Sequence, residues 1–97
     1  MRIIAISTLR AFWEKHPDVE QPLRAWYAEA KKANWKSFQE IKRLYPSASI
    51  VGNDRIVFNI KGNDYRLIVL VRFRGSKMFI RFVGTHSEYD RIDARTV

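Results

Sequence analysis

The sequence predicts an α+β fold in which an N-terminal strand and amphipathic helices pack on one face of an antiparallel β-sheet, with a short C-terminal helix. Two observations carry this prediction. Apolar residues in the first half recur at helical spacing, whereas those in the second half alternate with the two-residue period of strands. A chain of 97 residues has room for one modest core, so we expect a single domain over residues 1–97.

The first half is expected to hold one strand and three helices. The first six residues are rich in β-forming types, and Ser7 is a suitable N-cap for the helix that follows. Asp18 can cap a second helix. Ser37 and Glu40 have the spacing of a capping box, so a third helix is expected to begin there and to end before Pro46.

The second half is expected to form an antiparallel meander of three strands. The alternating stretches are 56–61, 65–74 and 78–83. The turn signals Gly62-Asn63 and Gly75-Ser76 separate them. Thr85 then lies three residues before Glu88, again the spacing of a capping box, which predicts a short terminal helix directly after the last strand.

Alternation also sorts the strand side chains onto two faces of the sheet. One face is wholly apolar: Ile56, Phe58, Ile60, Tyr65, Leu67, Val69, Val71, Phe73, Met78, Ile80 and Phe82. The other carries polar and basic groups: Asn59, Lys61, Arg66, Arg72, Arg74 and Arg81. We expect the apolar face to pack under the helices and the basic face to stay open, with His86 and Tyr89 at its rim.

The charge balance points to a polyanionic partner. Lys and Arg number 18 against 10 acidic residues, which gives a formal charge of +8 and an isoelectric point near 10.2. Such a field attracts nucleic acid first, although it also attracts acidic proteins and membrane surfaces. No apolar run approaches the ~18 residues of a membrane span and no signal-peptide pattern is present, so we expect a cytoplasmic protein without a membrane partner.

The composition offers few side chains for metal binding or thiol chemistry. The chain has no cysteine and two histidines, which excludes a disulfide framework, a thiolate nucleophile and the usual zinc ligation. We therefore expect any chemistry to run without a metal or another cofactor.

The basic face suits the binding and cleavage of RNA. In metal-free cleavage the 2′-hydroxyl attacks the adjacent phosphate, which requires a proton acceptor, a proton donor for the leaving 5′-oxygen and cations around the phosphorane. Lys61, Arg66, His86 and Tyr89 offer these groups. Each also has a structural explanation: exposed cations are often solvated, His86 lies inside a capping box, and Tyr89 can pack the terminal helix.

Four segments resemble the signature segments of the HigB toxin family, within the RelE/ParE-like superfamily. They are residues 33–37 (ANWKS), 44–48 (LYPSA), 57–67 (VFNIKGNDYRL) and 85–90 (THSEYD). The resemblance spans nearly the whole chain. It implies a RelE-like domain and the toxin of a type II toxin–antitoxin pair, a fold that by itself supports more than one activity.

The resemblance implies cleavage of mRNA, typically in the ribosomal A site, and neutralisation by a HigA-type helix-turn-helix antitoxin. It implies catalytic roles for Lys61, Arg66, His86 and Tyr89. Together with the face assignment, it predicts an RNA-binding set of Asn59, Asn63, Arg72, Arg74 and Arg81. Asn59 stands where related nucleases often carry lysine, and His86 where some carry arginine, so the choice between acid and base stays open.

Two alternatives of other classes remain at this stage. The first is a non-catalytic RNA- or ribosome-binding module, which needs only the basic face. The second is a ParE-like gyrase poison, which shares the fold but acts on a protein. The presence of Lys61, Arg66, His86 and Tyr89 together argues against a gyrase poison, and point variants of His86 separate binding from catalysis.

Overall fold

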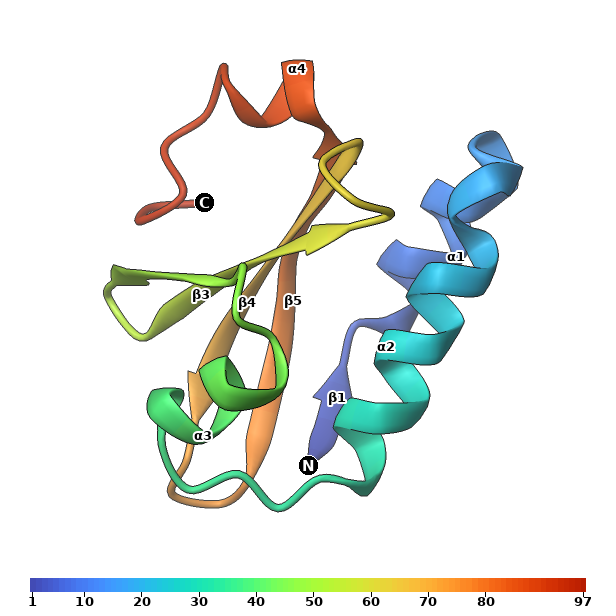
Figure 1. Ribbon diagram of the computed structural model, residues 1–97. Helices are drawn as coiled ribbons and strands as arrows, with labels where there is room; N and C mark the ends of the chain where they lie inside the picture. The colour runs from blue at the N-terminus through green and yellow to red at the C-terminus, as the bar shows by residue number, and fades with distance from the viewer.

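The computed structural model describes residues 1–97 and has a five-stranded mixed sheet at its centre (Figure 1). The strands lie in the order β1-β5-β4-β3-β2. Their bounds are β1 Arg2–Ile4, β2 Ser49–Gly52, β3 Arg55–Ile60, β4 Tyr65–Arg72 and β5 Lys77–Thr85. Strand β1 runs parallel to β5, and all other neighbouring strands are antiparallel. The predicted α+β class and the antiparallel meander are confirmed, and β2 is an additional strand that the sequence pattern does not predict.

Helices α1 and α2 lie side by side along one face of the sheet (Figure 1). The helical elements are α1 Ile6–Lys15, η1 Pro17–Val19, α2 Glu20–Lys32, α3 Phe38–Leu44 and α4 His86–Tyr89. No helix has the length and apolar character needed to cross a membrane.

Two of the expected helix caps are placed differently in the structure. Helix α1 begins directly after Ala5, so Ser7 lies inside the helix and does not cap it. Asp18 lies within η1 and its carboxylate bonds to other segments. The expected cap of α3 is confirmed, because Ser37 Oγ accepts a hydrogen bond of 3.3 Å from the amide of Glu40.

The apolar face of the sheet and the helices enclose one core of 19 buried residues. Leu9 of α1, Leu23 of α2 and Leu67 of β4 are fully buried in it. Trp26 lies edge-on to Phe58 of β3 with ring centroids 5.4 Å apart. Removal of this apolar surface from water is the main stabilising contribution in a domain of this size.

A β-bulge in β5 changes which face its last residues occupy. Ile80 pairs with Val69, but Phe82 pairs with Ile68, so one residue of β5 has no counterpart on β4. A bulge of this kind inverts the alternation beyond it. Phe82 therefore lies on the face away from α1 and α2, and Val83 packs against the core instead. The expectation that Phe82 belongs to the helix-covered face is wrong for this reason.

The second face of the sheet is not fully open. Residues 91–97, the C-terminal segment, return from α4 across this face toward β3 and β4 (Figure 1). The Asn53 side-chain amide donates to the Arg95 carbonyl oxygen over 3.0 Å. Val57 and Ile68 are 2% and 0% exposed although they lie outside the helix-side core. The expected basic face is thus covered at its centre and exposed at its ends.

Candidate active site

Three segments meet at one corner of the sheet: the β3–β4 turn, the start of β4, and the end of β5 with α4. Arg66 pairs with Asn59 on one side and with Gly84 on the other. The amide of His86 donates a hydrogen bond of 3.1 Å to the Asp64 carbonyl oxygen of the turn. Because the strand register sets these neighbours, Arg66 is held next to the helix that carries His86 and Tyr89.

A complete capping box forms α4 at the expected place. Thr85 Oγ1 accepts from the Glu88 amide over 3.2 Å, and Glu88 Oε1 accepts from the Thr85 amide over 2.8 Å. The hydrogen bond from the Thr85 amide lowers the pKa of Glu88, so the carboxylate stays charged at neutral pH. The box gives a helix of only four residues a fixed start, which confirms the sequence-based prediction.

Arg66 is half-buried at this corner with part of its guanidinium free. Its Cζ lies 5.7 Å from the centroid of the Tyr89 ring, a cation–π distance. Its Nη1 donates to the carbonyl oxygens of Asn63, over 2.8 Å, and Tyr65, over 3.3 Å. Nε and Nη2 bond to no protein group. The side chain is therefore held in place and still offers donors to an anion such as phosphate.

His86 stands on the exposed side of α4 beside a carboxylate. Its Nδ1 lies 3.2 Å from Asp90 Oδ2, and 54% of the His86 side chain is exposed. A carboxylate that accepts a hydrogen bond from Nδ1 leaves Nε2 as the nitrogen directed to a substrate. The imidazole shares α4 with Tyr89, whose ring the Arg66 guanidinium contacts, so the three side chains belong to one corner.

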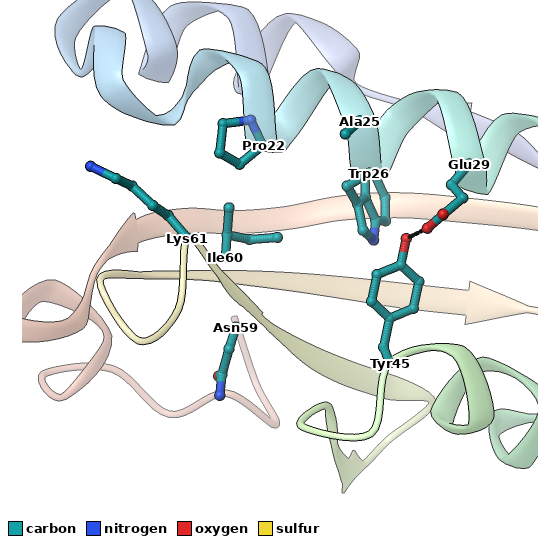
Figure 2. A pocket seen from close by; sticks show the side chains of 8 residues that line it. All are labelled: Pro22, Ala25, Trp26, Glu29, Tyr45, Asn59, Ile60 and Lys61. Atoms are coloured by element: carbon teal, nitrogen blue, oxygen red, sulfur yellow. Dashed lines mark hydrogen bonds between the residues drawn. The ribbon is translucent and has the colours of Figure 1, made fainter.

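Lys61 is not placed beside Arg66 on the outer face. Its backbone has a left-handed φ of 52° at the end of β3, and its Nζ lies 2.8 Å from Asp18 Oδ2 in η1. Tyr65 donates to the same carboxylate over 2.8 Å. In Figure 2 the side chains of Lys61 and Asn59 point in opposite directions. The expectation of one shared face for these cations is wrong at Lys61 because the chain turns there.

The titration of this second cluster follows from its hydrogen bonds. The Lys61 ammonium, and then the Tyr65 hydroxyl, lower the pKa of Asp18. The Asp18 carboxylate in return raises the pKa of Lys61. Burial, and then the bond to Asp18, raise the pKa of Tyr65. Lys61 therefore stays protonated, and the Asp18 carboxylate compensates its charge. Arg66 has no such carboxylate partner.

Four of the five predicted RNA-binding residues fall into two groups. Asn59 and Asn63 lie at the corner and bond to each other over 3.2 Å. Arg72 lies at the far end of β4, about 20 Å from Arg66 along the strand, and forms an ion pair with Asp54. Arg74 follows β4 in an exposed turn. Only the first group joins the corner.

Arg81 belongs to neither group. In the structure it is paired with Arg55, a residue that the predicted RNA-binding set does not include. Arg81 and Arg55 both donate to the main-chain oxygen of Val97. Arg55 occupies the alternating positions that also hold Val57 and Asn59, so the strand pattern contains the signal that finds it. Phe82, in contrast, reaches the outer face through the bulge, for which no sequence signal is present.

A cavity of about 200 Å³ lies between α2 and β3 (Figure 2). Tyr45 donates a hydrogen bond to Glu29 across it. Burial, and then the bond to Glu29, raise the pKa of Tyr45, so the hydroxyl stays protonated. Tyr45 and Glu29 satisfy each other, whereas the indole nitrogen of Trp26, which also lines the cavity, is buried without a hydrogen-bond partner.

Comparison with known proteins places the chain in a family. The model of the HigB toxin family, described as the RelE-like toxic component of a toxin–antitoxin system, matches residues 19–92. The chain belongs to the HigB toxin family. The resemblance noted from the four segments is thereby confirmed, and the family match includes the β3–β4 turn and α4. Membership in this family implies an antitoxin partner.

Several curated HigB proteins are similar along almost their full length. The mRNA interferase toxin HigB of Escherichia coli (strain K12) is 33% identical over 92 residues, which cover 93% of this chain and 88% of that protein. The mRNA interferase HigB of Shigella flexneri shows the same identity and coverage. The mRNA interferase HigB of Escherichia coli O6:H1 is 23% identical over 94 residues, 95% of this chain and 91% of that protein.

Proposed function

We propose that this HigB family member is an mRNA interferase, a metal-independent endoribonuclease that cleaves mRNA in the ribosomal A site in the cytoplasm. We also propose that a HigA-type helix-turn-helix antitoxin neutralises it. The names of the curated relatives support the activity. The formal charge of +8 supports an RNA or ribosome partner, since it attracts polyanions over long range.

The proposed reaction uses the RNA's own 2′-hydroxyl as the nucleophile. The 2′-oxygen forms a bond to the adjacent phosphorus while the bond from phosphorus to the 5′-oxygen breaks. One proton leaves the 2′-hydroxyl for a base, and one is given to the leaving 5′-oxygen by an acid. The products are a 2′,3′-cyclic phosphate and a 5′-hydroxyl end, and no redox partner or cofactor enters the balance.

Three side chains at the corner are assigned to these steps. His86 exchanges the proton through Nε2, with Asp90 fixing the ring at Nδ1. Arg66 directs its free Nε and Nη2 donors at the phosphate and stabilises the charge of the phosphorane. Tyr89 orients the Arg66 guanidinium and presents a ring or hydroxyl to the nucleotide. The pH dependence of the single-turnover rate distinguishes His86 as base from His86 as acid.

The ion pair with Asp18 changes the role that we assign to Lys61. A cation already neutralised by a carboxylate gives less stabilisation to a second anion. We propose that Lys61 mainly fixes the β3–β4 turn, and through it Asn63 and Arg66, instead of touching the reacting phosphate.

The observation that carries the proposal is the junction of Arg66 and α4. A guanidinium with free donors lies over the Tyr89 ring, beside an exposed imidazole on the same four-residue helix. A module that only binds RNA has no need for an imidazole–carboxylate pair next to such a cation.

Mapping of RNA ends in growing bacteria tests the proposal. Induction of the protein should arrest growth and create new 5′-hydroxyl ends within translated regions, while the His86→Ala variant at equal abundance should create none. Arrest with unchanged mRNA ends and altered DNA supercoiling would favour a gyrase poison instead. In a purified translation complex, cleavage should persist after the toxin is chelated and desalted, and recovery only with zinc or manganese would refute the metal-free reaction.

A further inference from the structure

Two arginines on the outer face of the sheet aim at a single oxygen atom. Arg55 Nε donates to the main-chain oxygen of Val97 over 3.0 Å, and Arg81 Nε donates to the same oxygen over 3.2 Å. Arg55 comes from β3 and Arg81 from β5, so the pair spans the intervening strand β4. We call this pair, Arg55 and Arg81, the arginine cradle.

The arginine cradle is only partly used by the group it holds. Arg55 makes one further bond, from Nη1 to the Asn53 carbonyl oxygen over 2.9 Å, and Arg81 makes none. One main-chain oxygen thus lies between two positive charges, and Arg81 Nη1 and Nη2 bond to no other protein group. Guanidinium forks are matched to the paired oxygens of an anion such as phosphate, so two guanidinium groups that converge on one point are suited to hold one.

The arginine cradle lies in line with the corner that holds Arg66. Arg55 precedes Asn59 by four residues on the same face of β3, which is about 13 Å along the strand. Asn59 in turn pairs with Arg66. An RNA strand that follows the sheet from the corner therefore reaches the cradle within a few nucleotides.

We propose that Arg55 and Arg81 bind a backbone phosphate of the RNA, which replaces the main-chain oxygen of Val97 between them. This inference rests on the proposed function, because it takes the RNA as the ligand. It adds a second phosphate site to the Arg66 corner and makes the end of the C-terminal segment an internal competitor for it.

The structure limits how much of the C-terminal segment has to move. The amides of Thr96 and Val97 both bond to the Asp93 carbonyl oxygen, at 3.1 and 3.2 Å, so the end of the segment is a compact turn. The bond from Asn53 to the Arg95 carbonyl oxygen holds the segment just before this turn. A shift confined to residues 96–97 is enough to free the cradle, and it leaves the bond between Asn53 and Arg95 intact.

The test is equilibrium binding of a short single-stranded RNA whose 2′-oxygens are methylated, so that it cannot be cleaved. Arg55→Ala and Arg81→Ala should each weaken binding about tenfold, the effect of one lost charged hydrogen bond. Each should also make the affinity less dependent on salt by about one counterion. Arg10→Ala removes the same charge from the exposed side of α1, on the opposite face, and should change binding little.

Two further measurements do not rely on these alanine variants. In the unaltered protein, the Nε–H magnetic resonance signals of Arg55 and Arg81 should shift as the RNA is added, and that of Arg10 should not. A variant without residues 96–97 should bind the RNA more tightly, because the competing oxygen is gone.

The outcomes separate this inference from the proposed function. Binding by Arg55→Ala and Arg81→Ala equal to that of Arg10→Ala, or unshifted Nε–H signals at saturating RNA, would overturn the cradle. Unchanged or weaker binding after removal of residues 96–97 would show that the Val97 oxygen does not hold a ligand site. In each of these cases the unaltered protein still cleaves mRNA on the ribosome, whereas loss of that cleavage would refute the proposed function itself.

Discussion

The turn between β3 and β4 directs two cations to different surroundings, and the contrast separates a structural cation from a candidate catalytic one. Lys61 meets the Asp18 carboxylate of η1 at 2.8 Å. Arg66, five residues later, meets two carbonyl oxygens and the face of Tyr89. Both are cations of the same short motif, yet only Arg66 keeps its charge uncompensated.

The partner of each cation decides what it can do for the protein. The Lys61–Asp18 pair links residues that are 43 positions apart, so it ties the α1–α2 junction to the β3–β4 turn. A cation held by neutral oxygens, in contrast, can still attract a phosphate. We expect substitutions at Lys61 and Asp18 to affect stability and substitutions at the Arg66 corner to affect the rate of cleavage.

The largest effect is expected at His86. Loss of a general acid–base group typically lowers a rate by about 10² to 10⁴. In single-turnover cleavage of a programmed ribosome at saturating toxin, the rate of the His86→Ala variant should be lower by this factor, and its affinity for the ribosome should be unchanged. The comparison variant is Arg74→Ala, since Arg74 is exposed in the turn after β4 and should affect only binding. Equal rates for the two variants would make His86 a structural residue.

A smaller effect is expected at Gly84, the neighbour of Arg66 on β5. A Cβ at this position would lie 2.5 Å from Cζ of Phe82 and 3.2 Å from Oε1 of Glu88. Gly84→Ala should therefore displace the Phe82 ring, disturb the capping box of α4, and destabilise the protein by about 1–3 kcal/mol, as overpacking does. The unfolding temperature and the cleavage rate should both fall.

The same position offers a rescue experiment. Phe82→Leu removes the end of the ring that the new methyl group meets, so Gly84→Ala combined with Phe82→Leu should unfold at a higher temperature than Gly84→Ala alone. Additive losses in the double variant would show that the ring is not the source of the strain.

The smallest effect, and one on stability alone, is expected at Asp18. Its pKa is lowered by Lys61 and then Tyr65. A carboxyl group with a lowered folded-state pKa adds stability that is present above its ordinary value of 3.8 and is lost as the pH falls below it. Asp18→Asn should thus unfold at a lower temperature than the unaltered protein at pH 7, and this difference should shrink below pH 3.8.

The Lys61 side of the pair gives the complementary pH limit. Its pKa is raised by Asp18, so its contribution to stability is present below 10.5 and is lost as the pH rises above that value. Glu14→Gln, at an exposed position of α1, is the matched control. If the difference in unfolding temperature between Asp18→Asn and Glu14→Gln does not change with pH, the ion-pair account is contradicted.

Local signals in the sequence predict most of the fold and the corner. The capping box of Thr85 and Glu88 lies within four residues, so its geometry follows from spacing alone. The pairing of Asn59 with Arg66 follows from the short turn between two alternating strands. Strand β2 escapes prediction because four residues ending in Gly52 carry too short a pattern.

The errors arise where position depends on one backbone angle or on distant segments. The left-handed φ of Lys61 turns its side chain away from Arg66. The bulge in β5 moves Phe82 to the outer face by a single inserted residue. The C-terminal segment has no periodicity, so its course over β3 and β5 is visible only in its bonds to Asn53, Arg55 and Arg81.

The most direct test of the division between the two clusters compares Arg66→Ala with Lys61→Ala. Both variants are measured for single-turnover cleavage at saturating toxin and for thermal unfolding. Arg66→Ala should cleave about 10² to 10³ times more slowly with little change in stability, and Lys61→Ala should unfold at a lower temperature and cleave at nearly the unaltered rate. A Lys61→Ala rate as low as that of Arg66→Ala, without a loss of stability, would contradict the account and place Lys61 in the catalytic machinery.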